Sequence, residues 1–143
     1  MRYWILGLLA ACSGDKGESA EQTTDSAETT ATVGMKPLVT GVTGATCSTN
    51  DSNPDAVEDS WLFTVTYDDP QGIETVTEGS LEAWNGDTQM TSAPMACSNG
   101  MCVASTRSSI TGITCDMKGA LRVIFSVRDA DGHPSVPYEY LTE

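Results

Sequence analysis

Two stretches of this chain alternate large apolar residues with smaller or polar ones, and this period-two pattern constrains the fold more than any other feature. The first covers residues 61–67 and the second residues 121–128. Successive side chains of a β-strand point to opposite faces, so each stretch predicts a strand with one buried and one solvent-facing side. No segment repeats apolar residues at helical spacing over three turns, and we predict no substantial helix.

From Lys36 onward, short runs rich in β-branched and aromatic residues are separated by clusters of Gly, Asp, Asn and Pro. Such near-regular spacing is typical of an all-β sandwich or barrel. Within the third run, Gly79 and Ser80 predict a bulge or a switch between sheets. The predicted strands cover residues 38–46, 57–68, 73–84, 88–96, 102–114, 118–128 and 134–142.

Seven short strands within residues 37–143 resemble the immunoglobulin-like modules found on bacterial surface lipoproteins. The resemblance implies an all-β, Ig-like sandwich of about seven antiparallel strands, with a jelly-roll fragment or a small barrel as the competing architecture. The sequence departs from the family in one respect, because no Cys on the second strand faces a Cys on the sixth. The subtype therefore stays open.

Four cysteines lie in this predicted domain. Successive strands run up and down, so Cys47, at the end of the first strand, and Cys115, before the sixth, lie at one pole. Cys97 and Cys102 flank the turn between the fourth and fifth strands at the other pole. Because a disulfide needs Cα atoms within about 7 Å, we predict the pairs Cys47–Cys115 and Cys97–Cys102. Zinc is the alternative use of these residues, but the spacing lacks C-x2-C, and we expect no cofactor.

The first residues read as an export signal. Arg2 precedes a short apolar run, too short to span a bilayer, that ends in Leu9-Ala10-Ala11-Cys12. These four residues resemble the bacterial lipobox, which implies a signal peptide over residues 1–11, cleavage before Cys12 and acylation of its thiol. The alternative is a plain secretory signal that leaves Cys12 as a spare thiol. The short leader also leaves open whether Met1 is the true start.

Acylation of Cys12 predicts a membrane anchor in a bacterial cell envelope. Ser13 stands where an Asp would resemble an inner-membrane retention signal, so an outer-membrane or cell-surface address is favoured. Residues 12–36 are rich in Ser, Thr and acids and poor in bulky apolar side chains. We therefore expect a disordered linker that holds the domain away from the lipid.

Charge and composition exclude several functions. The formal net charge is −13, which disfavours nucleic acid because phosphates need Lys and Arg. The single histidine, His133, lies in a turn without an evident nucleophile, and we expect no enzyme.

Asp129 and Asp131 in that turn, with the Asp68-Asp69 turn, are calcium candidates, although hairpin turns also require Asp.

Aromatic residues are the natural contacts for a partner. Trp84, before the Asn85-Gly86-Asp87 turn, is a candidate exposed contact, whereas Trp61 is expected in the core. The last predicted strand could accept another strand at its edge, although Pro137 opposes long pairing.

The sequence thus predicts a non-enzymatic, lipid-anchored envelope protein that displays one Ig-like domain to another envelope protein or glycan. The alternative is a carbohydrate- or small-ligand-binding module, stabilised by calcium.

Overall fold

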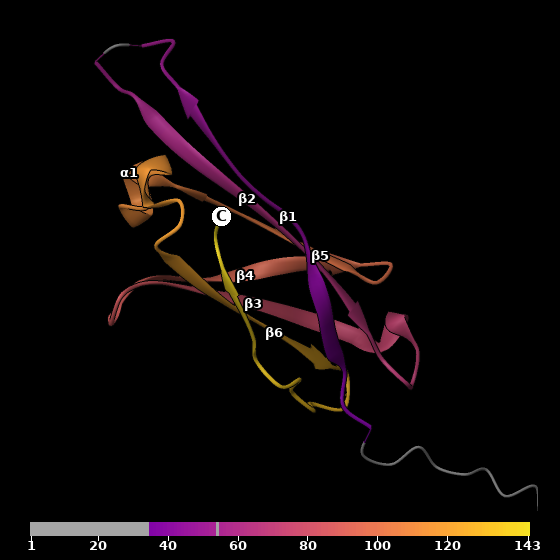
Figure 1. The fold of residues 1–143 in the computed structure, drawn as a ribbon. Helices are drawn as coiled ribbons and strands as arrows, with labels where there is room; N and C mark the ends of the chain where they lie inside the picture. Colours follow the sequence, from indigo (N-terminus) through magenta and orange to yellow (C-terminus); the bar gives the residue numbers. More distant parts are fainter. Residues whose placement is uncertain (1–34, 54) are drawn as a thin grey trace, which may run out of the picture. The chain divides into compact units, whose positions relative to one another are not determined.

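The computed structural model describes residues 35–53 and 55–143, and its architecture is almost wholly β (Figure 1). Seven strands carry most of these residues, and the helical elements among them are single short turns. This confirms the all-β class. The strands are β1 (Leu38–Asn50), β2 (Glu58–Asp68), β3 (Val76–Asn85), β4 (Thr88–Ser98), β5 (Met101–Arg107), β6 (Leu121–Asp129) and β7 (Tyr138–Leu141); the helical turns are η1 (Ile73–Thr75), α1 (Ser108–Thr111) and η2 (Cys115–Met117).

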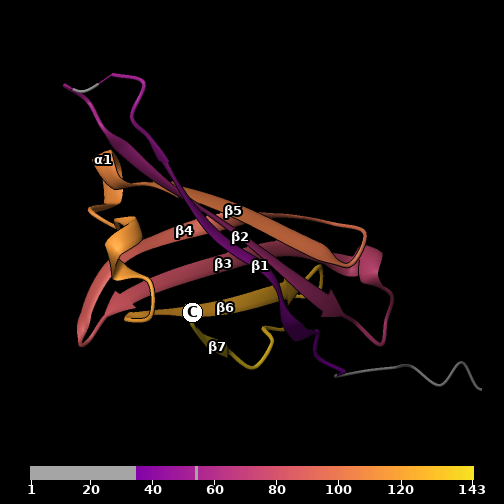
Figure 2. The same ribbon diagram turned by 45° about the horizontal axis from the view of Figure 1, so that its top comes forward.

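All strand pairings are antiparallel, and the strands follow the order β1-β2-β5-β4-β3-β6-β7. β1, β2 and β5 form one layer, β3, β6 and β7 form the other, and β4 joins the two (Figure 2). Immunoglobulin domains place the first, second, fifth and fourth strands opposite the third, sixth and seventh, and this chain follows that strand order except that β4 pairs with both layers. The predicted Ig-like sandwich of seven antiparallel strands is therefore present.

The two alternating stretches supply the core. On β2, Trp61 and Phe63 are 1% and 0% exposed, whereas Leu62 between them is 46% exposed. β6 repeats the pattern, with buried side chains at 121, 123, 125 and 127. The Phe63 and Phe125 rings meet between the layers with centroids 6.0 Å apart. Burial of each large side chain contributes about 1.5–3 kcal/mol, so these positions dominate the stability of the sandwich.

Both predicted disulfides are present. Cys47 and Cys115 have Cα atoms 5.6 Å apart, and their bond connects β1 in one layer to η2, just before β6 of the other. β1 is longer than predicted and continues to Asn50, so Cys47 lies within it. Cys97 and Cys102 are direct cross-strand partners on β4 and β5, with Cα atoms 4.0 Å apart. The pairing that was predicted from alternating strand directions is therefore confirmed.

The bulge or strand switch predicted at Gly79-Ser80 is wrong. β3 pairs continuously through both residues with β4 and with β6. Gly79 is buried, and a Cβ there would lie 2.5 Å from Cys97 Sγ and 3.2 Å from Cys102 Sγ. Glycine is present because the second disulfide packs directly against the β3 backbone, and the strand that changes sheets is β4.

The fifth strand is shorter than the predicted range 102–114. β5 ends at Arg107, and the chain then forms the single turn α1. Gly112 ends this turn in the left-handed conformation, with φ 72°. Ile110 and Ile113 are three residues apart, a spacing that suits a helical turn as well as a strand, and Ile113 alone is buried. A short apolar run of this kind cannot be assigned from its period alone.

The seventh strand also begins later than predicted. The expected range was 134–142, whereas β7 covers Tyr138–Leu141. Pro134 and Pro137 have no N–H to donate to a ladder, and only an isolated bridge joins Pro134 to Arg128. The last strand is nevertheless an edge of the sheet, as the sequence indicated.

Candidate binding groove

β4 changes partners along its length, and this opens the sheet beside β5. Residues 88–95 pair with β3, whereas only Ala96, Cys97 and Ser98 pair with β5. Continuing the β4–β5 register would place Pro94 opposite Ser105. Proline lacks the N–H that the next ladder bond would use. The sequence therefore ends the β4–β5 ladder at the Ala96–Val103 pair, and the two strands separate beyond it.

A groove of about 290 Å³ occupies this opening. Its walls are residues 91–94 of β4, residues 105–107 of β5, and residues 110 and 111 of α1. These lining residues include no aromatic side chain and no carboxylate. The lining therefore does not support stacking on a sugar ring or catalysis by a carboxylate. Its charged residue is Arg107. We take this groove as the candidate functional site.

Thr106 lines the groove, and its buried hydroxyl makes no hydrogen bond. The residue is 5% exposed, because it points inward from β5 with Cys102 and Ala104. Its Oγ1 is the one buried side-chain N or O atom of residues 35–53 and 55–143 that lacks a hydrogen-bond partner. An unsatisfied buried group of this kind costs about 1–3 kcal/mol. A polar group that entered the groove could remove that cost.

The third wall, α1, presents an exposed apolar side chain. Ile110 is 81% exposed, the highest value among the exposed large apolar residues of the described chain. Thr111 Oγ1 donates a hydrogen bond of 2.9 Å to the Arg107 carbonyl and so fixes the turn against the end of β5. The groove therefore places the exposed apolar side chain of Ile110 beside the polar residues 105–107 of β5.

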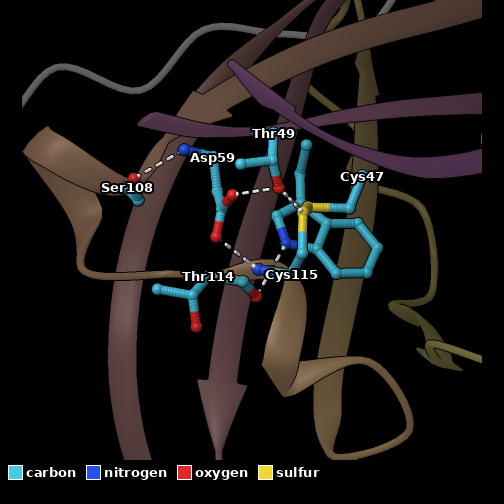
Figure 3. Close-up of a disulfide and its surroundings, with 7 residues drawn as sticks. Cys47, Thr49, Asp59, Ser108, Thr114 and Cys115 are labelled. Carbon is cyan, nitrogen blue, oxygen red and sulfur yellow. Dashed lines mark hydrogen bonds between the residues drawn. A yellow bond between two sulfur atoms is a disulfide. The ribbon is translucent and has the colours of Figure 1, made fainter. Parts of the chain in front are cut away.

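The first disulfide and Asp59 hold α1 in place (Figure 3). The Asp59 N–H donates to Ser108 Oγ at 2.9 Å, at the start of α1. The Cys115 N–H donates to Asp59 Oδ2 at 2.9 Å, beside the bond from Cys115 to Cys47. Thr49 Oγ1 donates to the other carboxylate oxygen. Asp59 of β2 thus joins β1 and η2 through its carboxylate, and it joins the α1 turn through its main-chain N–H.

These hydrogen bonds change the acidity of Asp59. The Thr49 hydroxyl and the Cys115 amide both donate to its carboxylate, and together they outweigh burial. They hold the pKa of Asp59 below its ordinary value of 3.8. The anchoring carboxylate is therefore ionised at neutral pH, where it accepts both bonds.

Beside the groove, the outward face of the β1-β2-β5 layer carries few charges. On β2, no outward side chain between Ser60 and Thr66 is charged, and the same holds from Met101 to Ser105 on β5. Leu62, Met101 and Val103 are 46%, 44% and 37% exposed. We call the outward residues of β2 from Ser60 to Thr66 and of β5 from Met101 to Ser105 the bare face. In a chain with a net charge of −13, a bare apolar face marks a surface suited to contact.

The calcium candidates are not arranged as a cation site. Both Asp129 oxygens contact His133, which donates its N–H at 2.7 Å and places Nδ1 at 3.0 Å. Asp131 is exposed in the turn. In the part of the chain that the structure describes, no three His, Cys, Asp or Glu side chains are grouped to hold a metal. Calcium binding by Asp129 and Asp131 stays a prediction without a built site.

His133 has a partner that the sequence did not reveal. Burial raises the pKa of Asp129, but the hydrogen bonds and the charge of His133 outweigh it, and the pKa ends below 3.8. A carboxylate thus orients the imidazole, as in a catalytic dyad. The neighbouring Ser135 is 6% exposed, and its Oγ accepts the Val127 N–H at 3.0 Å. The Ser135 hydroxyl is therefore already hydrogen-bonded to β6. The contact between Asp129 and His133 closes the turn that follows β6.

Trp84 is not the exposed contact that the sequence suggested. It is half-buried, with the Arg122 guanidinium 5.5 Å from its ring centroid. Its Nε1–H donates to Glu82 at 3.3 Å. Trp84 therefore packs with Glu82 and Arg122 on the β3-β6 layer, and it is not one of the residues that line the groove.

Cys12, the predicted signal peptide and the linker of residues 12–36 lie outside the described residues, except for residues 35 and 36. No helix of the described chain is long and apolar enough to cross a membrane. Comparisons of the chain with protein-family models, with curated proteins and with solved structures found no match. The site therefore has to be interpreted from its own geometry.

Proposed function

We propose that this chain is a non-enzymatic, lipid-anchored protein of a bacterial cell envelope whose Ig-like domain binds another envelope protein. The bare face beside the groove is the observation that carries the binding role, because Leu62, Met101 and Val103 are exposed on a strongly acidic chain. The Leu9-Ala10-Ala11-Cys12 motif supports the anchor. A groove lining without aromatic rings favours a protein partner over a glycan.

The anchor can be tested separately from the binding role. Radiolabelled fatty acid should label the full chain in a bacterial host and should fail to label a Cys12→Ser variant. Equal labelling of both chains would contradict acylation at Cys12.

The binding role is tested by photocrosslinking in the native envelope. A photoreactive amino acid in place of Val103 lies on the bare face, and the same amino acid in place of Asp131 lies on an exposed turn away from the groove. We expect one discrete adduct from position 103 and none from position 131. No adduct at 103, or the same adducts from both positions, would contradict a binding function for this face.

A further inference from the structure

The last residues of β5 have main-chain N–H and carbonyl groups that no strand pairs with on the side of the groove. In an antiparallel pair, hydrogen-bonded partners have Cα atoms about 5.5 Å apart and non-bonded partners about 4.5 Å. Cys97 and Cys102 are 4.0 Å apart and are therefore a non-bonded pair. The main-chain hydrogen bonds between β4 and β5 are therefore made by the neighbouring pairs, one of which is Ala96 with Val103.

The turn between β4 and β5 gives the same result independently. Asn99 and Gly100 both have positive φ, 50° and 77°, which defines a two-residue hairpin turn of the primed type. Such a turn is flanked by a hydrogen-bonded pair, here Ser98 and Met101. Main-chain groups alternate sides along a strand, so Met101, Val103, Ser105 and Arg107 direct theirs toward β4.

Two of these residues have no ladder partner on that side. The β4–β5 ladder ends at Val103, so the Ser105 N–H and carbonyl and the Arg107 N–H face the groove. The Arg107 carbonyl is already used by Thr111 Oγ1. On their other side, Thr106 and Ala104 complete the ladder to β2. β5 is thus fully paired on one edge and open on the other for its last residues.

The open edge has the chemistry of a strand acceptor. Ser105 and Arg107 lie about 6.8 Å apart along the strand, the repeat that an extended peptide presents with its own N–H and carbonyl groups. Thr106, whose buried hydroxyl makes no hydrogen bond, is one of the lining residues, and Ile110 supplies an exposed apolar contact. Arg107 adds a positive charge in a chain of net charge −13.

We propose that the groove binds an extended segment of a partner polypeptide, which adds as a strand to the open edge of β5. The segment pairs its main chain with Ser105 and Arg107, satisfies the Thr106 hydroxyl, and places an apolar side chain on Ile110. An acidic side chain pairs with Arg107. This inference rests on the proposed protein-binding role and names the mode of recognition, which is β-augmentation.

The first experiment screens random heptapeptides, displayed on phage, against the full chain in detergent micelles. Enriched peptides are then followed by amide hydrogen exchange. We expect them to slow exchange of the Ser105 and Arg107 amides, while the Val103 amide is unchanged. A screen without enrichment, or enriched peptides that protect other amides instead, would overturn strand addition.

Matched variants separate main-chain from side-chain recognition. Ser105→Pro removes the N–H that faces the groove and should abolish peptide binding, whereas Ser105→Ala keeps that N–H and should bind as the parent chain does. Thr106→Val removes the unsatisfied hydroxyl and should weaken binding about fivefold while raising the melting temperature. A merely structural role for Thr106 would change the melting temperature alone.

A second measurement covers the case in which Ser105→Pro fails to fold. N-methylation of single amides in an enriched peptide should abolish binding at alternate positions, as pairing with one strand edge requires. Binding that tolerates every N-methyl group would overturn the proposal. Self-association of the chain that Ser105→Pro abolishes would assign the groove to a second copy and also overturn it.

Failure of this inference can be distinguished from failure of the proposed function. An adduct at position 103 together with peptides that avoid the β5 edge would leave the binding role standing and remove strand addition. Protection of Ser105 and Arg107 by peptides without any envelope adduct would leave strand addition standing and remove the envelope partner.

Discussion

The two layers of the sandwich follow the same alternating pattern but differ in what they present to solvent. Outward from β3, β6 and β7, Arg122 pairs with Glu139 at 3.5 Å and Arg128 pairs with Glu78 at 3.6 Å. Outward from β1, β2 and β5 lies the bare face, with exposed Leu62 and Val103. Charged side chains keep the first face solvated, whereas the second has little to oppose desolvation. The inward residues thus build the fold, and the outward residues separate a solvated face from a contact face.

The largest expected effect concerns what holds the layers together. Replacing both Cys47 and Cys115 by Ala removes a bond between residues 68 apart in sequence, and the chain-entropy model gives a loss of about 4 kcal/mol. Urea unfolding measures it. The control is Cys97→Ala with Cys102→Ala, which opens a short loop and should cost about 2 kcal/mol. Equal losses would show that the layers do not depend on the long-range bond.

The second effect concerns the close contact between β3 and the other disulfide. Gly79→Ala would place a Cβ 2.5 Å from Cys97 Sγ, and overpacking of this kind costs about 1–3 kcal/mol. Gly44→Ala on β1 meets only ordinary contacts at 3.6 Å and should be nearly neutral. Thermal unfolding compares the two. If Gly79→Ala were as harmless as Gly44→Ala, the disulfide would not pack as described.

A third effect is a dependence on pH. Asp59 has a lowered pKa when folded, so its contribution to stability is fully present above pH 3.8 and is lost as the pH falls through the lower folded value. The parent chain should therefore lose more stability between pH 5 and pH 2 than Asp59→Asn does, in urea unfolding at stepped pH. Thr49→Val removes one of the two donors and should give an intermediate slope. Parallel pH profiles for all three would contradict the role given to this carboxylate.

The smallest effect tests the charged face. Arg122→Leu removes an exposed ion pair and a contact with Trp84, and exposed pairs contribute about 0–1 kcal/mol. Urea unfolding should barely change, and crosslinking through position 103 should be unaffected. Loss of the position 103 adduct in this variant would show that the charged face, and not the bare face, contacts the partner.

Much of the fold could be predicted from the sequence because its signals are local. Alternation at residues 61–67 and 121–128 predicted the two central strands and their buried faces. The disulfide pairing required only the count and direction of strands. The Asp59 network was not predictable, since it depends on Thr49 and Cys115 meeting one carboxylate from separate elements.

The groove was missed for a related reason. Pro94 inside the predicted fourth strand was the available signal, because proline interrupts a ladder. Its consequence becomes visible only when the register places it opposite Ser105, and no local pattern gives that register. Thr106 likewise looks like an ordinary buried strand residue until its hydroxyl is found without a partner. Sites made by the absence of pairing are harder to infer from sequence than sites made by its presence.

The most direct test of the central claim is amide hydrogen exchange on the full chain without any added peptide. The claim is that β5 is paired on both sides up to Val103 and open on its β4 side beyond it. We expect the Val103 amide to exchange slowly and the Ser105 and Arg107 amides to exchange fast, although all three lie on one strand. Slow exchange at Ser105 and Arg107, matching Val103, would mean that the β5 edge is closed and would contradict the account.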